Sequence, residues 1–411
     1  MSSRQAPSIA TPRTTAAIAA VTGSNIVRVR HFNERVVLHA IRINGVMSPA
    51  DLARHTQLTP QAVSTIVHQL TRDGLLREQP RRYGSVGQPA RQYDLDPEGA
   101  YALGVKLGRR SISLVAIDFV GRIIEQIHHD AEFPPPEEGA RLIVDGARQL
   151  LDGLAGRRAK VAGIGIATPF NLACWHAQLG ISSQRYREWD VFDFGEHLRA
   201  HTGLPIHVEN DGSSAAVAEL FFGTGRRLDS FFYVYLGTAV GGGVIVGGDY
   251  HRGFTGNAGD FGLMPVETAP GEWDILLSVV SFASLLRHLR QHVECAGTTD
   301  SVAQLFAARP GLFAPWIEQT ARYLAPPLIA VNCVLDTGAF VFGGRLPGSL
   351  LATLVEETKK RYQAIAQHPL RVPAFILGEI DSEAPALGAA MLPFYAAYAP
   401  NREVLLKRAA G

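Results

Sequence analysis

A run of polar side chains between residues 59 and 68 has the chemistry needed to read the edges of base pairs. Gln61, Thr65 and His68 are spaced i, i+4 and i+7, so on a helix they lie along one side. Their hydrogen-bond donors and acceptors complement those that base pairs present in the major groove of DNA. Thr59 and Ser64 add hydroxyl groups nearby. We predict that these residues contact DNA.

A stretch rich in cations follows the polar run. Arg77, Arg81, Arg82 and Arg91 flank a glycine-rich segment, and Glu78 is the one acid among them. The segment predicts a hairpin with a glycine-rich tip. Positive charge on a hairpin beside a reading helix is typical of a wing that lies along DNA phosphates. We therefore predict phosphate contacts from Arg81, Arg82 and Arg91.

Asn210 and Asp211 form a third group of interest. They lie between LPIHVEN, which predicts a strand, and GSSAAVAELFFG, which predicts a helix. Polar groups at the carboxyl end of a strand in an α/β sheet stand where such folds bind ligands. The pair can also act only as the N-cap of the following helix, and the two roles are compatible.

Three short helices must position the polar run. The first lies within NERVVLHAIRINGVM and stops at Gly45. The second begins at Ser48, because Ser48, Pro49 and Asp51 have the pattern of a capping box, and it ends around residues 55–57. The third begins at Thr59 by the same logic. Its core-facing stripe consists of Val63, Ile66, Val67 and Leu70.

The short turn between the second and third helices is typical of a helix-turn-helix. The following strand pair completes the pattern of a winged helix. A three-helix module for protein interaction, with a polar face that is merely solvated, is the alternative reading.

From residue 97 onward, short β-rich runs alternate with helical stretches. VAGIGIATP, SFFYVYLGT, GGGVIVGG and GAFVFGG predict strands, whereas GARLIVDGARQLLDGL and WIEQTARYLAPPLIAVNCVL predict helices. This alternation predicts an α/β body. FPPPEEG, at residues 133–139, predicts a loop inside that body. Asp96–Pro97 marks the boundary between the helical module and the body.

The composition narrows the class of protein. The 411 residues carry a formal net charge of +1, which excludes a uniformly basic coat protein but allows a small DNA-binding module on a neutral body. Cys174, Cys295 and Cys333 are too far apart for a disulfide framework, which favours a cytoplasmic protein. No apolar run approaches the ~20 residues that span a bilayer, so we expect no membrane partner.

Several motifs, in the same order, resemble the ROK family of repressors and sugar kinases. SPADLARHTQLTPQAVSTIVHQLTRDGLL, followed by GSVGQPARQYDLDP, resembles the winged helix-turn-helix of the family's transcriptional regulators. The motifs that resemble the sugar-kinase body are GIGIATP, LPIHVENDGSSAAVAE, LGTAVGGGVIVGG, GNAGDFGLMPV and FVFGGRL. The resemblance covers about residues 30–395.

The resemblance implies an actin-like (ribonuclease H-like) body of two lobes with a sugar cleft between them. The expected order is a disordered arm at 1–25, the winged helix-turn-helix at 26–96, the body at 97–398 and a tail at 399–411. The catalytic base of the kinase members maps onto Asp211, and a sugar ligand maps onto Asn210. Further sugar-binding acids map onto Asp260 and Asp274.

Two features of the kinase members are changed in this chain. Their first phosphate loop, DIGGT, aligns with KLGRR at residues 106–110. Three bulky cations, Lys106, Arg109 and Arg110, replace an acid and small residues that ATP and its metal need, so we expect neither kinase activity nor a cofactor. These cations can instead attract an anion on the effector, or simply be solvated or salt-bridged. The family's zinc cluster is missing, with Leu263 in place of its histidine, so we expect no metal site.

These patterns together predict a DNA-binding transcription regulator, expected to repress genes of carbohydrate uptake or catabolism. The expected partners are double-stranded operator DNA, a sugar or sugar derivative as effector, and further copies of the chain in a homodimer or homotetramer. Two alternatives stay open at this point. One is an ATP-dependent sugar kinase with an attached DNA-binding module, and the other is a regulator whose cleft binds nothing.

Overall fold

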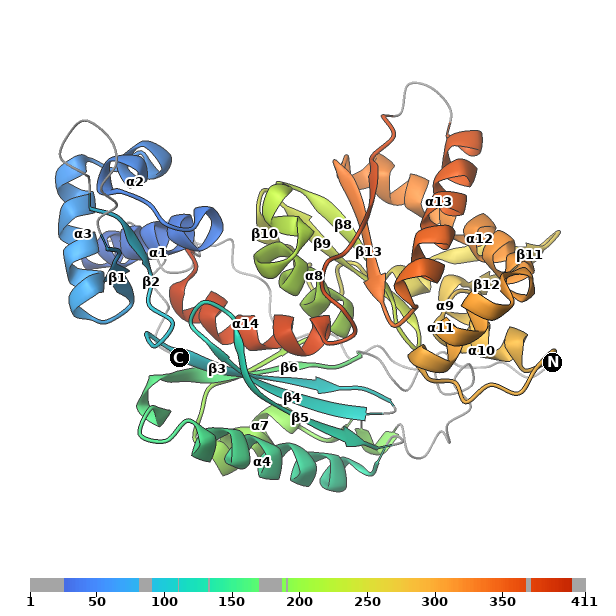
Figure 1. Ribbon diagram of the computed structural model, residues 1–411, viewed down its shortest axis with the longest axis horizontal. Coiled ribbons are helices and arrows are strands. Elements are labelled where there is room, and N and C mark those ends of the chain that lie inside the picture. The colour runs from blue at the N-terminus through green and yellow to red at the C-terminus, as the bar shows by residue number, and fades with distance from the viewer. Residues whose placement is uncertain are drawn as a thin grey trace, which may run out of the picture.

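The protein consists of a small helical module and a larger body built on two mixed sheets (Figure 1). The computed structural model describes residues 26–80, 91–109, 111–131, 134–169, 187–189, 191–366 and 371–400. The predicted arm at 1–25 and most of the predicted tail lie outside these ranges, so the domain limits at both ends stay predictions. The predicted fold class, a winged helix joined to an α/β body, is confirmed.

The N-terminal module has the predicted helices and wing strands. Its elements are α1 (Ile26–Asn44), α2 (Pro49–Thr56), α3 (Pro60–Arg72), β1 (Leu76–Glu78) and β2 (Tyr93–Leu95). The capping box is confirmed: the Ser48 hydroxyl accepts the Asp51 backbone N–H at 3.2 Å, and Asp51 accepts the Ser48 N–H at 3.3 Å. Gly45, at φ 75°, ends α1 as predicted.

The first helix begins earlier than the sequence indicated. Val27 and Val29 in its first turns are exposed, so no buried stripe marks residues 26–32 as a helix. Polar contacts between side chains one turn apart stabilise this part instead. Arg30 and His31 both reach Glu34, at 3.0 and 3.1 Å.

The first sheet of the body has the strand order β5-β4-β3-β6-β7. Its strands are β3 (Tyr101–Leu107), β4 (Ser111–Asp118), β5 (Ile123–Asp130), β6 (Val161–Ala167) and β7 (Ile206–Glu209). The helices α4 (Pro136–Gly153) and α7 (Phe194–Thr202) cover one face (Figure 1). The predicted loop at 133–139 is therefore wrong in its second half, because Pro136 begins α4, where its missing N–H is harmless.

The helix α14 (Ala384–Tyr398) lies on the other face of the first sheet, between that sheet and α1 (Figure 1). Two glycines allow this close packing. A Cβ at Gly104 would stand 2.1 Å from the Ala386 carbonyl oxygen, and one at Gly165 would stand 1.8 Å from the Ala389 carbonyl oxygen. Larger side chains at these positions would push α14 off β3 and β6.

The second sheet has the order β10-β9-β8-β13-β14. Its strands are β8 (Phe231–Leu236), β9 (Val240–Val246), β10 (Asp249–Tyr250), β13 (Ala339–Gly344) and β14 (Ala374–Leu377). The helix α8 (Asp211–Phe222) packs on one face, and α12 (Ala314–Leu335) and α13 (Gly348–Ile365) pack on the other. As predicted, α12 continues through Pro326 and Pro327.

Shorter elements connect and flank the strands and helices of the two sheets. They are η1 (Arg158–Lys160), η3 (Thr224–Arg227), η4 (Phe261–Leu263), β11 (Pro265–Ala269), β12 (Glu272–Ile275), α9 (Leu276–Val279), α10 (Phe282–Leu289), α11 (Thr299–Ala308) and η5 (Pro310–Leu312). Most of these elements lie between β10 and α12 in the chain and form the connection between them.

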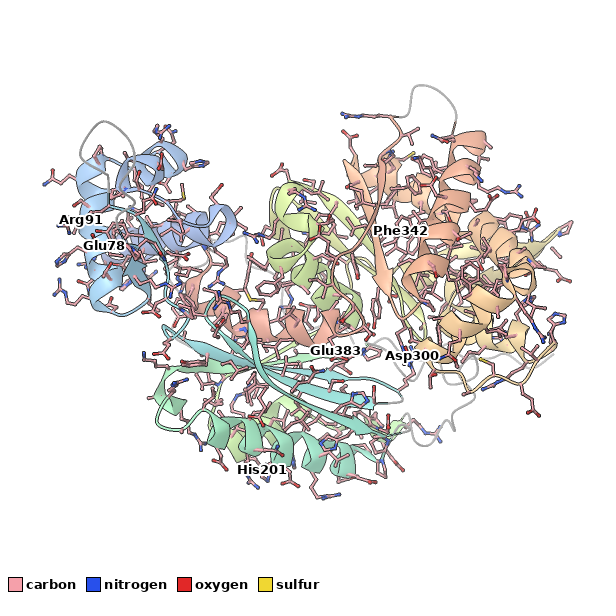
Figure 2. All side chains as sticks on the ribbon, in the orientation of Figure 1. Glu78, Arg91, His201, Asp300, Phe342 and Glu383 are labelled. Atoms are coloured by element: carbon pink, nitrogen blue, oxygen red, sulfur yellow. The ribbon has the colours of Figure 1, made fainter. Side chains whose placement is uncertain are left out.

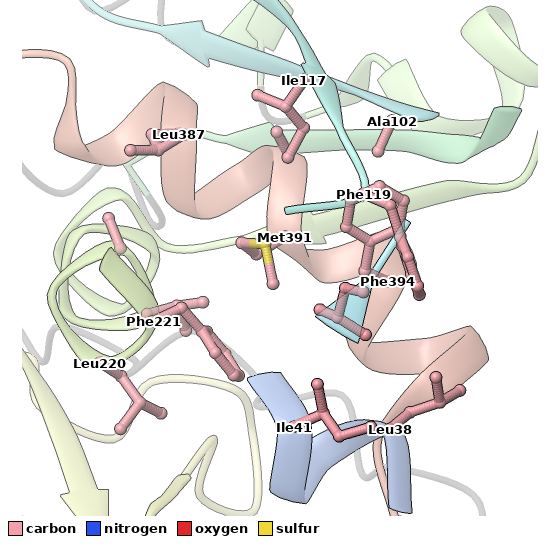
Figure 3. Close-up of a cluster of buried hydrophobic side chains, with 14 of the residues drawn as sticks. Leu38, Ile41, Ala102, Ile117, Phe119, Leu220, Phe221, Leu387, Met391 and Phe394 are labelled. Atoms are coloured by element: carbon pink, nitrogen blue, oxygen red, sulfur yellow. The ribbon is translucent and has the colours of Figure 1, made fainter. Parts of the chain in front are cut away.

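One hydrophobic cluster joins the helical module to the body (Figure 3). Leu38 and Ile41 of α1 belong to the same buried cluster as Phe119, Phe221 and Phe394 of the body. The predicted boundary at residues 96–97 is thus bridged by a continuous apolar core. Burial of apolar surface on both sides stabilises one placement of the module on the body.

Candidate DNA-binding surface and ligand cleft

The predicted reading face of α3 is open to solvent. Gln61, Ser64, Thr65 and His68 are all exposed, while the stripe on the other side of the helix is buried. The Thr65 hydroxyl donates to the Gln61 carbonyl oxygen at 3.0 Å, so its oxygen stays available as an acceptor. These side chains do not take part in the core, and nothing in the described part of the chain covers them.

Thr59 has a structural role at the beginning of α3. Its hydroxyl accepts the Ala62 backbone N–H at 3.3 Å, which makes it the N-cap of the helix. Thr59 is also exposed. It therefore stands at the positive end of α3, where an approaching phosphate is favoured electrostatically.

The described part of the wing is less basic than its sequence indicated. The Arg91 guanidinium lies 3.5 Å from the Glu78 carboxylate, and Arg77 lies 3.8 Å from Asp94 (Figure 2). Both pairs are largely exposed, so they remain accessible to phosphates. Arg81 and Arg82, in the predicted tip of the wing, lie outside the described residues.

A cavity of about 110 Å³ lies between the two sheets of the body. Its walls come from both sheets and from the segments that precede α11 and α14. The lining residues are Lys106, Gly108, Arg109, Ser111, His128, Pro169, Asp211, Tyr235, Thr238, Ala239, Thr299, Arg345, Ser382 and Glu383. The cavity lies where we predicted a cleft, and most of the side chains that line it are charged or polar.

Asn210 is the N-cap of α8, and Asp211, the first residue of that helix, lines this cavity. The Gly212 backbone N–H donates to Asn210 Oδ1 at 2.9 Å and to Asp211 Oδ1 at 3.0 Å. Burial raises the pKa of Asp211, against the opposing charges of Arg109 and Lys106. The N-cap interpretation of Asn210 is thus confirmed, and Asp211 keeps a cavity-facing position that suits a ligand.

The predicted effector acids are not all alike. Burial and the negative charge of Asp211 raise the pKa of Asp260 to about 6, so these two acids lie close enough to interact. Asp274 lies on the exposed strand β12, where its Oδ1 accepts the Ile275 N–H at 2.7 Å. Leu263, where kinase members have histidine, is 43% exposed.

The cations of the altered phosphate loop point into the fold. Lys106 Nζ donates to the Ser382 carbonyl oxygen at 2.8 Å, and burial lowers the pKa of Lys106. Arg109 lines the cavity with it. Arg110 lies outside the described residues. Lys106 therefore ties the end of β3 to the segment that begins α14.

Three further charged residues lie around the cleft and were not predicted from the sequence. Arg345, after β13, donates to the Thr238 hydroxyl at 3.3 Å. Glu383 precedes α14 and lines the cavity (Figure 2). The Glu209 side chain is 1% exposed, and its carboxylate pairs with the Arg252 guanidinium at 2.7 Å. It also accepts the Asn210 N–H at 2.9 Å, so it positions Asn210. Of these three residues, only Glu209 could have been predicted from the sequence, because a charged residue at the end of a buried strand needs a partner.

Glycines of the β8–β9 hairpin serve packing rather than an open loop. A Cβ at Gly242 would stand 2.7 Å from the Phe232 ring, and one at Gly243 would stand 2.5 Å from the Ala216 Cβ. Only Gly241 of this run has no atom within 4 Å of its Cβ position. Close approach of α8 to β9 therefore accounts for Gly243, whereas the Phe232 ring and the Gly259 backbone account for Gly242.

The helix α14 connects the cavity with the N-terminal module. Its beginning is held at the cavity by the bond between Lys106 and Ser382. At its other end, Arg35 of α1 donates to the carbonyl oxygens of Ala396 and Ala399, at 3.0 and 3.2 Å.

A second arginine of α1 strengthens this junction. Arg42 donates to the Phe119 carbonyl oxygen at 2.8 Å, and its guanidinium lies 4.8 Å from the centre of the Phe119 ring and 5.7 Å from that of Phe394. Burial lowers the pKa of Arg42 to about 10, so the side chain remains a cation at neutral pH. Cation–π contacts of a buried guanidinium hold the two helices in one relative orientation.

Comparison with known proteins places these features in a family. The sequence matches the ROK family over residues 102–394. The chain belongs to the ROK family. Residues 32–83 match the MarR family, so the N-terminal module of this ROK protein is a MarR-type winged helix domain. The resemblance inferred from the motifs is thereby confirmed.

Relatives of this ROK protein include both regulators and kinases. It is 25% identical to the xylose repressor of Bacillus spizizenii, over 58% of this chain and 62% of the repressor. It is 26% identical to the glucokinase of Streptomyces coelicolor, over 71% of this chain and 96% of the kinase. The chain thus spans less than two thirds of the repressor's length.

The fold of the whole chain has a close counterpart among solved structures. The crystal structure of a ROK family transcriptional regulator, a homologue of the E. coli MLC protein, superposes with a TM-score of 0.68. The match covers 92% of this chain and 98% of the regulator, at 18% identity. The likeness shows that the winged helix and the two-sheet body occur together in one known fold.

The described residues contain neither a cluster of metal ligands nor a helix that could span a membrane. No three His, Cys, Asp or Glu side chains among them are grouped so as to hold a metal ion. Within the same residues, no helix combines the length and the apolar character needed to cross a membrane.

Proposed function

We propose that this ROK protein is a transcription repressor whose affinity for operator DNA is set by a sugar or sugar derivative bound in its cleft. The observation that carries the proposal is the exposed polar face of α3 on a MarR-type winged helix. Polar side chains that contribute nothing to the core, in a fold that places this helix in the major groove, are best explained by contact with DNA.

In the proposed complex, α3 reads bases and the wing follows the backbone. Gln61, Ser64, Thr65 and His68 contact base edges, and Thr59 contacts a phosphate at the beginning of the helix. Arg81, Arg82 and Arg91 contact phosphates. A homodimer or homotetramer would present two such modules to a palindromic operator.

The effector would bind where the two sheets meet. Asn210, Asp211, Asp260 and Asp274 are the proposed ligands for its hydroxyl groups, because a carboxylate or carboxamide can accept from two neighbouring hydroxyls. The similarity to the xylose repressor of Bacillus spizizenii supports a sugar as effector and genes of carbohydrate uptake or catabolism as targets.

The helix α14 offers a physical route from the effector to DNA. It touches the cavity at Ser382–Glu383 and holds α1 through Arg35 and Arg42. A ligand that favours one arrangement of the two sheets would therefore shift the placement of the winged helix. The coupling needs only a difference in ligand affinity between the two arrangements.

Selection of genomic fragments by the full chain, with and without a panel of sugars, tests the proposal. We expect enrichment of a palindromic sequence near carbohydrate genes, and release of that sequence by at least one sugar or derivative. Enrichment of no sequence above bulk DNA would contradict the DNA-binding function. Enrichment without release by any member of the panel would support a regulator whose cleft is empty.

A sugar kinase is the second candidate, favoured by the position of Asp211 in the cleft and by the glucokinase relative. Lys106 and Arg109 oppose it, because they fill the place where ATP and its metal would need an acid and small residues. A coupled ATPase assay with pentoses and hexoses separates the two. We expect no sugar-dependent turnover, and robust turnover would establish the kinase.

A further inference from the structure

We propose that the cavity between the sheets binds the anionic group of an acidic sugar derivative through Lys106, Arg109 and Arg345. The group is a phosphate ester or a carboxylate. The proposal deepens the proposed function and depends on it, since it names the chemical class of the effector. It also gives the altered phosphate loop a use, because cations that exclude ATP and its metal would select an anion in the same place.

Charge around the cavity favours an anion. Three cations, Lys106, Arg109 and Arg345, stand against two carboxylates, Asp211 and Glu383. The lining therefore presents positive charge to the cavity from three side chains. Coulomb attraction to that charge is stronger in a partly enclosed cavity than in open solvent, because the effective dielectric constant is lower.

The cations have donor capacity to spare. Lys106 carries three donors and makes one hydrogen bond within the described residues, to the Ser382 carbonyl oxygen. Among the same residues, the Arg345 side chain makes one hydrogen bond, to the Thr238 hydroxyl, and stacks on Phe282 at 5.3 Å. Stacking fixes the guanidinium plane while its remaining N–H groups stay available, which suits bidentate recognition of a carboxylate or phosphate.

The same lining also favours a ligand that carries hydroxyl groups. Glu383 Oε2 is buried and has no hydrogen-bond partner among the described residues. A buried acceptor of this kind is costly unless a donor reaches it. A bare anion would supply no donor and would be repelled by Glu383, whereas a sugar hydroxyl beside the anionic group would donate to it. The pattern therefore selects a ligand with both groups.

The size of the cavity agrees with this division. Its volume of about 110 Å³ is below the roughly 300 Å³ at which pockets for drug-sized ligands begin. It has room for the anionic end of a ligand and not for a nucleoside triphosphate. The rest of the sugar would extend toward Asp211 and Asp260, which interact electrostatically.

The cations belong to opposite sides of the cleft. Lys106 lies near the end of β3 of the first sheet and Arg109 follows that strand, whereas Arg345 follows β13 of the second sheet. An anion bound by both sides would draw the sheets together. A neutral sugar lacks that bridge, so acidic and neutral ligands differ in their effect on the arrangement as well as in affinity.

Calorimetric titration of the full chain with matched ligands tests the inference. Each pentose and hexose is compared with its terminal phosphate and its aldonic acid, and inorganic phosphate is added as a competitor. We expect at least one acidic derivative to bind about tenfold or more tightly than its neutral parent, since hydrogen bonds to charged groups contribute that much. Whether the phosphate or the carboxylate member binds identifies the anion.

Two variants with the same change in charge make the comparison specific. Arg345→Gln is expected to weaken the binding of the acidic ligand about tenfold and to leave the affinity for the neutral parent sugar unchanged. Arg148→Gln serves as the control, because Arg148 is an exposed residue of α4 whose partner is Asp145 at 3.8 Å. Thermal unfolding confirms that both variants are folded.

Each outcome decides the inference. Equal binding of a neutral sugar and its acidic derivatives, or equal behaviour of the two variants, would overturn the anion site and leave the proposed function intact. Binding of no ligand in the panel would overturn the site as well. Operator binding by the same preparation tests the proposed function separately, so the two failures are distinguishable.

Discussion

The face of α3 and the cleft of the body differ in what surrounds their polar side chains. On α3 the polar groups are exposed, and the core lies on the opposite side of the helix. In the cleft, Asp211, Asp260 and Lys106 are partly buried, and each has a shifted pKa. For the proposed function, this means that substitutions can change the specificity for DNA without loss of fold, whereas substitutions in the proposed effector site also change stability.

The largest expected effect comes from removing the reading face of α3. Replacing Gln61, Thr65 and His68 together with Ala should lower the preference for operator over unrelated DNA by about 100-fold or more, since each base contact contributes about 1–3 kcal/mol. The free energy of unfolding should stay unchanged. Quantitative DNA binding and denaturant unfolding measure the two quantities.

A substitution on the other side of the same helix is the control. Ile66→Ala removes a side chain that is 6% exposed, and it should cost about 2–5 kcal/mol of stability. If the triple variant keeps its preference for operator DNA, α3 is not the helix that contacts the bases. The contrast between α3 and the cleft would then be wrong.

The junction between the two regions should respond to a substitution that preserves charge. Arg42→Lys loses the planar guanidinium over Phe119, and we expect about 1–2 kcal/mol less stability. The ratio of operator affinities without and with the effector should also fall toward one. Arg54→Lys, at a position where the side chain is 77% exposed, should change neither quantity. Undiminished coupling in Arg42→Lys would show that the signal bypasses this contact.

The acids of the cleft should make stability depend on pH. Burial and Asp211 raise the pKa of Asp260 from 3.8 to about 6, so the folded state holds the proton more tightly than the unfolded state. The stability that this group contributes is complete below about pH 4 and is lost as the pH rises through about 6.

Asp260→Asn mimics the protonated acid. At pH 7 it should raise the free energy of unfolding by about 1 kcal/mol, and the difference from the natural protein should vanish below about pH 4. Asp274→Asn, at an exposed position, should have no such effect. A destabilised Asp260→Asn at pH 7 would contradict the interpretation of the cleft as a place where function opposes stability.

The smallest effect is expected at the wing. Arg91→Gln should reduce the dependence of DNA affinity on salt by less than one counterion, because Glu78 partly neutralises Arg91. Replacing Arg81 and Arg82 should reduce it by about two. Affinity measured over a range of salt concentrations gives these slopes. Equal slopes in all three proteins would remove the wing from the set of phosphate contacts.

Local rules made the helical module predictable from the sequence. Ser48, Asp51 and Thr59 cap helices through bonds to residues three positions away, so spacing alone identifies them. The alternation of buried and exposed positions on α3 is equally local. The early beginning of α1 was missed because Val27 and Val29 are exposed, and the edge strand β5 was missed because alternate residues face solvent.

The cleft was less predictable because its residues come from distant parts of the chain. Asp211 was found through a motif, and its charge environment could not be found that way. Arg345 and Glu383 meet Lys106 only when the two sheets and α14 are assembled. Spacing in the sequence carries no information about such contacts. Among the described residues, neither side chain makes a hydrogen bond or ion pair within one helical turn that would indicate its role.

The placement of α14 has a consequence for how the protein is made. A ribosome releases α1 long before α14, yet the Arg42 of α1 finds its aromatic neighbour Phe394 only on that late helix. Docking of the winged helix can begin on Phe119 and Phe221, but it is complete only when almost the whole chain has been synthesised. A product that terminates prematurely before residue 384 would carry α3 without the part of the attachment that α14 provides.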